Sequence, residues 1–164
     1  ILVTASQAPE FSEPETVPLR RLFQISPLAF VGIGLQGFAA SMIFGMGAVF
    51  ANIIGMTNQQ GSIFLASFTI ANVVMQYPIG RMSDRFDRRL VILVVASISA
   101  LAAAIASIVG LSNYWALLGL TALFGGFSMT IYSLCIAHAN DYLSPSQMVG
   151  TASALITVLS LIHI

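Results

Sequence analysis

The side chains of this sequence that could do electrostatic chemistry are concentrated in one short stretch, "GRMSDRFDRR", residues 80–89. The chain has six basic and six acidic residues, and half of them fall in these ten positions: Arg81, Asp84, Arg85, Asp87, Arg88 and Arg89. A carboxylate such as Asp84 can accept hydrogen bonds from a helix N-terminus, and guanidinium groups can pair with carboxylates or helix C-termini. Gly80 is expected to permit a tight turn. The stretch is therefore predicted to latch two helix bundles together and to release when they separate.

Outside this stretch the sequence shows none of the patterns that carry covalent catalysis or cofactor binding. No nucleophile triad and no metal-ligand spacing of His, Cys, Asp or Glu is present. The run "GIGLQG", residues 32–37, matches a phosphate-binding glycine pattern, but it lies in an apolar segment without a preceding strand. The formal net charge is zero, which gives no indication of a nucleic-acid partner. We expect no enzyme activity, no metal, no cofactor and no nucleic-acid partner.

The elements that must position the charged stretch are predicted from composition. Hydrophobic residues make up 57% of the chain and charged residues 7%, whereas soluble domains contain about 25% charged residues. A transmembrane helix needs roughly 20 predominantly apolar residues. Five stretches meet or approach this length, at about 27–54, 61–79, 90–111, 115–137 and 145–164. The predicted fold class is an all-α integral membrane protein, a bundle of five transmembrane helices.

Local signals mark where these helices begin and end. Ser26-Pro27 and Ser144-Pro145 each place a capping hydroxyl before a proline at the first helical position. Pro78-Ile79-Gly80 is predicted to end the second helix, because proline and glycine punctuate helix ends. The charged stretch would then be a loop between the second and third helices.

The distribution of charge predicts the orientation in the membrane. All six arginines precede the first segment or lie between the second and third, and the linkers at 55–60 and 112–114 carry no charge. The positive-inside rule makes the arginine-bearing side cytoplasmic. The range 1–24 and the loop 80–89 are therefore predicted to be cytoplasmic.

Four polar residues within the apolar segments are candidates for lining a solute cavity: Gln36, Asn72, Gln76 and Tyr132. Polar side chains at membrane depth usually face the bundle interior or a water-filled cavity. For each of the four, a hydrogen bond between helices is the alternative to contact with a solute, because polar groups in lipid need partners in any case. The small and polar residues of segments 27–54 and 115–137 favour these as cavity walls, with segment 90–111 as outer support.

The stretch 80–89 resembles the motif that transporters of the major facilitator superfamily carry between their second and third helices, and often again between their eighth and ninth. That motif reads Gly, three residues, Asp, Arg or Lys, one residue, Gly, Arg, and Arg or Lys. The residues that match it are Gly80, Asp84, Arg85, Arg88 and Arg89. Asp87 stands where the family most often has Gly.

The resemblance implies which part of such a transporter the chain represents. The Pro- and Glu-rich range 1–24 is similar to the cytoplasmic linker between the two six-helix halves. The chain is then expected to be a fragment, helices seven to eleven of the C-terminal half, whose partners are the N-terminal half of the same protein, the lipid bilayer and a small-molecule substrate. In this family the halves rock about a central site, and the loop aspartate stabilises one state by contacting a helix end of the opposite half. The resemblance assigns this latch role to Asp84.

The function predicted is a secondary active transporter that moves a small solute by alternating access, in a bacterial inner membrane. A membrane-embedded enzyme would need clusters of His, Asp, Ser or Glu at mid-membrane, which the sequence lacks. A channel-like helical bundle or a non-transporting membrane subunit stays open as the alternative. Neither of those would need a latch in the loop.

Overall fold

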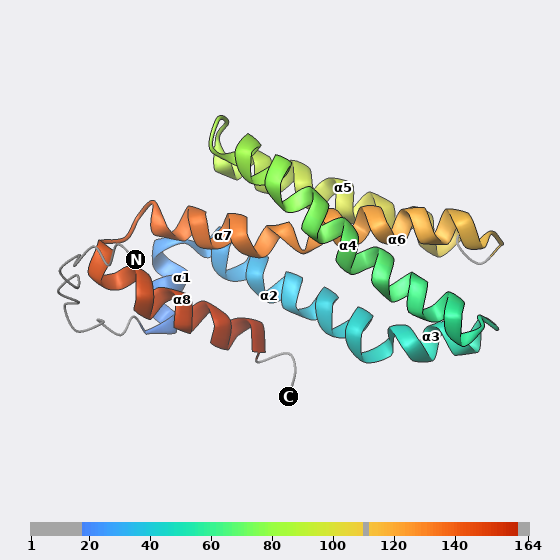
Figure 1. Cartoon of the computed structure of the whole chain (residues 1–164). Helices are drawn as coiled ribbons and strands as arrows, with labels where there is room; N and C mark the ends of the chain where they lie inside the picture. The colour runs from blue at the N-terminus through green and yellow to red at the C-terminus, as the bar shows by residue number, and fades with distance from the viewer. Residues whose placement is uncertain (1–17, 110–111, 161–164) are drawn as a thin grey trace, which may run out of the picture.

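The computed structural model describes residues 18–109 and 112–160, and within these ranges it is helical without any strand. Figure 1 shows the helices as an elongated bundle. The elements are α1 (Leu19–Ile25), α2 (Pro27–Ser41), η1 (Met42–Met46), α3 (Gly47–Ile53), α4 (Asn58–Ser83), α5 (Arg88–Val109), α6 (Tyr114–Ser128), α7 (Thr130–Asn140) and α8 (Pro145–Ser160).

Four helical stretches in the described residues are long and apolar enough to cross a membrane. They are Pro27–Ile53, Asn58–Ser83, Arg88–Val109 and Tyr114–Asn140. The first joins α2 and α3 through the π-helical turn η1, and the fourth joins α6 and α7. The predicted all-α membrane fold is confirmed. The stretch predicted at 145–164 contains the shorter helix α8, and its last four residues lie outside the described ranges.

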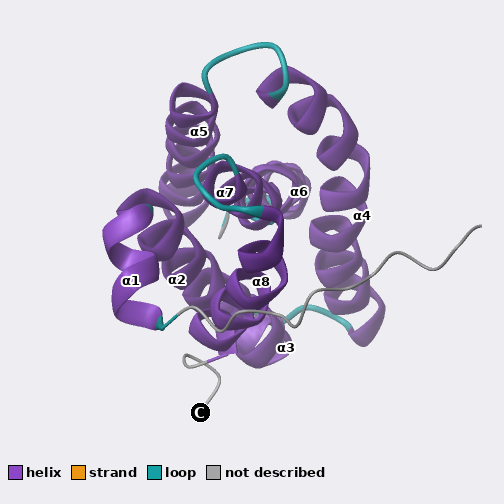
Figure 2. Ribbon diagram, turned by 90° about the vertical axis from the view of Figure 1, so that its left-hand side faces the viewer, coloured by secondary structure: helices purple, strands orange, loops and turns teal. Residues whose placement is uncertain are grey.

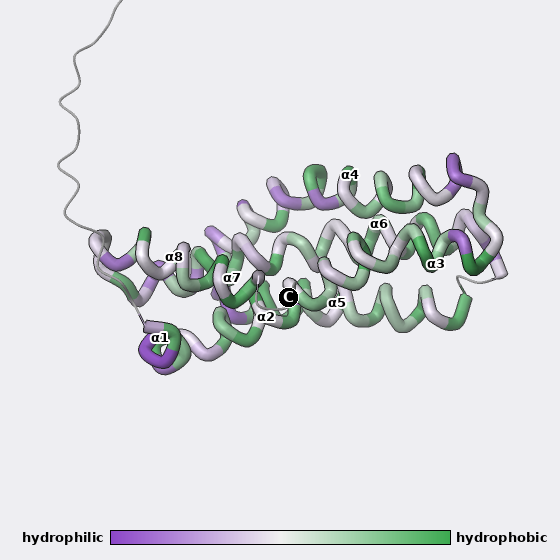
Figure 3. The backbone as a smooth tube through the Cα atoms, turned by 90° about the horizontal axis from the view of Figure 1, so that it is seen from below, coloured by the Kyte–Doolittle hydropathy of each residue, from purple (hydrophilic) through white to green (hydrophobic). Residues whose placement is uncertain are grey.

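The arginine-bearing elements all lie at one end of the bundle, which we call the arginine end. Figure 1 shows α1, the α4–α5 loop and the α7–α8 turn at this end, with the α3–α4 connection at the other. Figure 3 shows hydrophilic residues gathered at α1 and near helix ends, and a largely hydrophobic α5. Residues 19–24 of the predicted linker belong to α1, a short helix across the bundle end, and residues 1–17 are outside the described ranges.

Side-chain caps fix several helix starts. The Ser26 hydroxyl accepts a hydrogen bond from the Ala29 amide at 3.4 Å, as predicted for this start. At the start of α4, Thr57 and Gln60 form a reciprocal capping box that we did not predict. The Asn113 side chain caps α6 through the amides of Trp115 and Ala116.

The predicted end of the second helix at Pro78-Ile79-Gly80 is wrong. Helix α4 contains Pro78 and runs on to Ser83. Proline in a membrane helix is tolerated because neighbouring groups and local adjustments satisfy the freed backbone carbonyl. Gly80 is therefore a helical residue and not part of a tight turn; among the described residues only Gly55 has a positive φ, of 77°.

Close helix packing in the middle of the bundle depends on two glycines of α6. A Cβ added at Gly125 would lie 2.5 Å from the Phe68 carbonyl oxygen of α4, and one at Gly126 would lie 2.9 Å from Met75 Cγ. Only glycine allows α6 to come this close to α4, which is a common use of small residues in membrane bundles. Helix α6 also packs along α5, so it lies between α4 and α5, as Figure 2 shows in end view.

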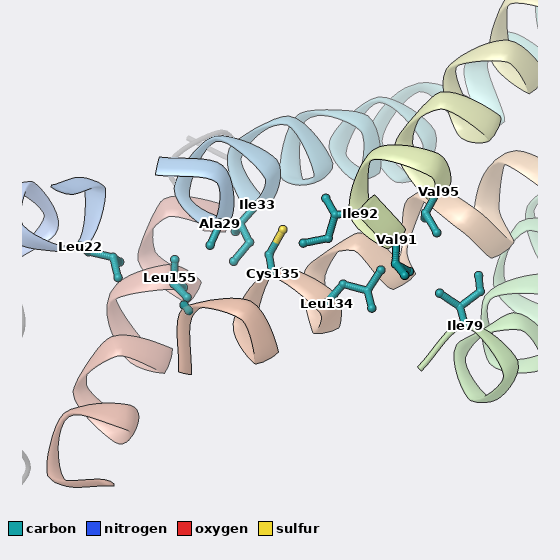
Figure 4. Close-up of a cluster of buried hydrophobic side chains, with 11 residues drawn as sticks. Leu22, Ala29, Ile33, Ile79, Val91, Ile92, Val95, Leu134, Cys135 and Leu155 are labelled. Carbon is teal, nitrogen blue, oxygen red and sulfur yellow. The ribbon is translucent and has the colours of Figure 1, made fainter. Parts of the chain in front are cut away.

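The main hydrophobic core lies at the arginine end, under the charged loop. Figure 4 shows side chains from α1, α2, α4, α5, α7 and α8 converging there. The buried members are Leu22, Ala29, Ile33, Ile79, Val91, Ile92, Val95, Leu134, Cys135, Ala139 and Leu155. Because Ile79 and Val91 flank the charged loop in sequence, this core holds both of the helices from which the loop emerges.

Candidate functional site

The charged loop reverses the chain within four residues, Asp84 to Asp87. The Asp84 amide donates to the Gly80 carbonyl at 3.1 Å, so Asp84 closes α4 at its C-terminal end. Asp87 then starts α5, because its Oδ1 accepts a hydrogen bond from the Arg89 amide at 2.8 Å. An aspartate is a favoured N-cap residue and needs no left-handed backbone. This explains how the turn forms with Asp at the position where the family motif most often has Gly.

Arg88 lies between two carboxylates from different helices. Its Nη2 is 3.6 Å from Asp84 Oδ1, and its Nε is 3.4 Å from Asp141 Oδ2. Asp141 directly follows the last residue of α7. Arg88 therefore ties the end of α4 and the start of α5 to the end of α7.

Arg89 makes a second contact with the turn between α7 and α8, which contains Asp141. Its Nη2 donates a hydrogen bond to the Tyr142 hydroxyl at 2.9 Å, and its Cζ lies 5.9 Å from the centroid of the Tyr142 ring. The His138 ring, which is buried, meets the Tyr142 ring edge-to-face at 5.3 Å between centroids. Sequence reasoning predicted carboxylate or helix-end partners for these arginines but did not identify Tyr142, since residues 89 and 142 are far apart in sequence.

The charged side chains of Arg81, Asp84 and Arg85 are more exposed than that of Arg88. The Asp84 side chain is 72% exposed although it lies near Arg88. Arg85 is exposed, and within residues 18–109 and 112–160 its side chain has no hydrogen bond or ion pair. Arg81 donates to the Tyr77 hydroxyl on its own helix at 3.0 Å. Asp84, despite its pairing with Arg88, and Arg85 are thus exposed where another surface can reach them.

The four candidate cavity residues do not form one cluster. Gln36 is buried, its Nε2 donates to the Met129 sulfur at 3.1 Å, and its Oε1 has no partner in the described part of the chain. Tyr132 is half-buried on α7 against the hydrophobic core. Asn72 is half-buried and Gln76 exposed, and their spacing of four residues puts them on one face of α4.

Two adjoining hollows of about 780 and 560 Å³ lie between the first span and α5. They share Ala39 and Phe124 as lining residues, so they form one groove with an almost wholly apolar wall. Gln36 lines this groove, whereas Asn72, Gln76 and Tyr132 do not. Of the four candidates, Gln36 alone thus contributes to the wall of this groove.

Comparison with known families agrees with this arrangement of apolar spans and a charged loop. The family model described as Major Facilitator Superfamily matches residues 29–162, which is most of the chain. The chain belongs to the Major Facilitator Superfamily. The family resemblance expected from residues 80–89 is thereby confirmed.

Relatives within the superfamily are similar to this chain over only part of their length. The uncharacterized MFS-type transporter YcaD of Escherichia fergusonii is 25% identical over 125 residues, which cover 76% of this chain and 31% of the relative. The uncharacterized MFS-type transporter YfkF of Bacillus subtilis is 29% identical over 143 residues, covering 84% and 36%. No solved structure matches the chain significantly. The chain thus spans about a third of the length of these relatives.

Proposed function

We propose that the chain is part of a secondary active transporter that moves a small solute across the membrane by alternating access. The superfamily and the names of its relatives support a transporter. The observation that supports alternating access is the difference in surroundings among the charged side chains of the loop. Arg88 and Arg89 are held by the α7–α8 turn, whereas Asp84, which also pairs with Arg88, and Arg85 are exposed at the surface.

This difference suits a latch between two halves. The inner contacts hold the loop in a fixed shape, and Arg88 keeps the exposed Asp84 carboxylate in place, where an approaching helix end can reach it. A carboxylate at a helix N-terminus is worth about 0.3–1 kcal/mol, and up to about 2 kcal/mol where it is partly buried. A latch of this strength biases an equilibrium between two states by several-fold but does not lock it, as an alternating cycle requires.

The surface that Asp84 meets would belong to the N-terminal half of the complete protein. We propose that the present chain provides helices seven to eleven of the C-terminal half, with the range 1–24 as the linker between halves. The arginine end would face the cytoplasm by the positive-inside rule, in a bacterial inner membrane. The transport cycle needs no covalent chemistry and no cofactor.

For contact with the solute we propose Asn72 and Gln76 ahead of Gln36. Asn72 and Gln76 share a face of α4, and Gln76 is exposed in this chain, so the face is available to a central cavity between halves. Gln36 is buried against Met129, which fits the alternative role of bonding between helices. Tyr132 packs partly into the core and would contribute only its exposed edge.

Solute counterflow tests the proposal against a channel-like bundle. The complete protein would be reconstituted in liposomes loaded with unlabelled solute, and uptake of trace labelled solute would be followed for a panel of sugars, organic anions and lipophilic cations. A transporter gives saturable uptake that is accelerated by unlabelled solute inside. Flux that rises linearly with concentration and shows no acceleration would instead establish a channel.

A further inference from the structure

Tyr142 lies between α7 and α8 and contacts Arg89 beside the charged loop. It lies in the turn between Asn140, the last residue of α7, and Pro145, the first of α8. Its hydroxyl accepts from Arg89 Nη2 at 2.9 Å, and its ring lies edge-to-face with His138. One side chain therefore joins the start of α5 to the last turn of α7 and to the segment leading into α8.

The α7–α8 turn makes a second contact with α5 beside the Arg89–Tyr142 hydrogen bond. Asp141 pairs with Arg88 at 3.4 Å, so two consecutive residues of the turn are held by two consecutive residues of α5. Helix α8 itself packs mainly on α2 and touches α7 only slightly. The double contact thus holds the α7–α8 turn, which leads into α8, against the start of α5, while α8 packs on α2 near Val158 and Leu159.

We propose that Tyr142 is a positioning residue that makes the start of α8 move together with the charged loop. The inference rests on the proposed transport function, because it gives a route by which the state of Asp84 reaches a helix of the bundle. When Asp84 is engaged, the loop is held, and Arg89 keeps the turn and the first residues of α8 in place. When the loop is released, the Arg89–Tyr142 contact, together with the neighbouring Arg88–Asp141 pair, makes the start of α8 follow it.

The chemistry of the contact predicts a graded response to substitution. Tyr142→Phe keeps the ring against His138 and under the Arg89 guanidinium but removes the hydrogen-bond acceptor. Tyr142→Ala removes all three interactions. Arg89→Lys keeps a donor but loses the planar guanidinium that stacks on the ring. We expect Tyr142→Ala to loosen the α7–α8 turn more than Tyr142→Phe does, and Arg89→Lys to loosen it about as much as Tyr142→Phe.

Amide hydrogen exchange of the complete protein in liposomes measures this coupling without a transport assay. We expect Tyr142→Ala to raise exchange several-fold in the first turns of α8, residues 146–151, and in the loop at residues 85–89. Tyr142→Phe should give a smaller rise at the same amides. The matched control is Tyr132→Phe, since the Tyr132 hydroxyl makes no hydrogen bond in the described part of the chain.

A coupled effect distinguishes positioning from a purely local role. Combining Tyr142→Phe with Arg89→Ala should add nothing to Arg89→Ala alone, because both remove the same contact. In counterflow, Tyr142→Ala should lower kcat with KM changed by less than about two-fold, since no solute contact is lost.

Three results would overturn the inference: unchanged exchange at 146–151 in Tyr142→Ala, additive effects of the two substitutions, or a raised KM with kcat unaltered. The exchange pattern as predicted together with absent counterflow would instead count against the proposed function and leave the positioning role intact.

Discussion

Arg88 and Asp141 come together across the arginine end of the bundle, with 3.4 Å between Nε and Oδ2, although one begins α5 and the other follows α7. The Arg88 side chain is 27% exposed and that of Asp141 47%. The pair therefore sits at the edge of the protein and not in its interior. This partly exposed position limits how much the ion pair can stabilise the protein.

Asp141→Asn is predicted to destabilise the complete protein only slightly. Exposed ion pairs contribute about 0.2–1 kcal/mol and are screened by salt. We expect the unfolding temperature in detergent to fall by a small amount at low ionic strength, and the difference from wild type to shrink in concentrated salt. Asp87→Asn is the control, because it removes the same charge and asparagine caps a helix as well as aspartate does. A large loss of stability that salt does not reduce would contradict the exposed-pair account.

Gly125→Ala is predicted to disturb the packing of α6 on α4. The new methyl would lie 2.5 Å from the Phe68 carbonyl oxygen, so one backbone must move. Overpacking of this kind costs about 1–3 kcal/mol. Gly119→Ala is the matched control on the same helix, where a Cβ meets nothing within 4 Å, and it should gain up to about 1 kcal/mol from helix propensity. Thermal unfolding of both variants measures the difference, and equal stabilities would show that α6 and α4 are not this close.

Gly80→Ala tests whether α4 continues through the proline. In a helix with open space around it, this substitution should leave the unfolding temperature unchanged or raise it, because alanine favours helix by about 1 kcal/mol. Gly55→Ala provides the contrast: at a φ of 77° a side chain is strained, and a loss of about 1–2 kcal/mol is expected. If Gly80→Ala destabilised the protein as much as Gly55→Ala, the tight turn first expected at residue 80 would be right after all.

Much of this fold could be predicted from sequence because the membrane imposes strong rules. Long apolar stretches must be helical in lipid, and the Ser26-Pro27 start followed from capping chemistry. The predicted end of α4 at residues 78–80 was wrong for a related reason. Rules for proline come mainly from helices in water, whereas a membrane helix can contain Pro78 and continue to Ser83.

The site was only partly predictable. The spacing in the sequence singled out Asp84, Arg88 and Arg89, whose role in a latch stays a prediction, but it did not indicate the Asp87 cap or the Tyr142 contact. A cap can be missed when a family motif expects glycine at the position. Contacts between residues 89 and 142 depend on how α5 packs beside α7, which no local pattern encodes. Gln36, Asn72, Gln76 and Tyr132 were chosen for polarity, and polarity does not indicate which face of the bundle a residue occupies.

In the proposed transport cycle, Asp84 acts as a latch between two halves of a transporter. The most direct test is the distance, by pulsed electron paramagnetic resonance, between a spin label at Phe86→Cys and one on the arginine side of the other half. Phe86 is 64% exposed within the loop. In the complete protein without solute, Asp84→Asn should shift the distribution toward longer distances, while the charge-matched Asp87→Asn should match wild type. Identical distributions for all three proteins, or the same shift in both variants, would contradict the latch.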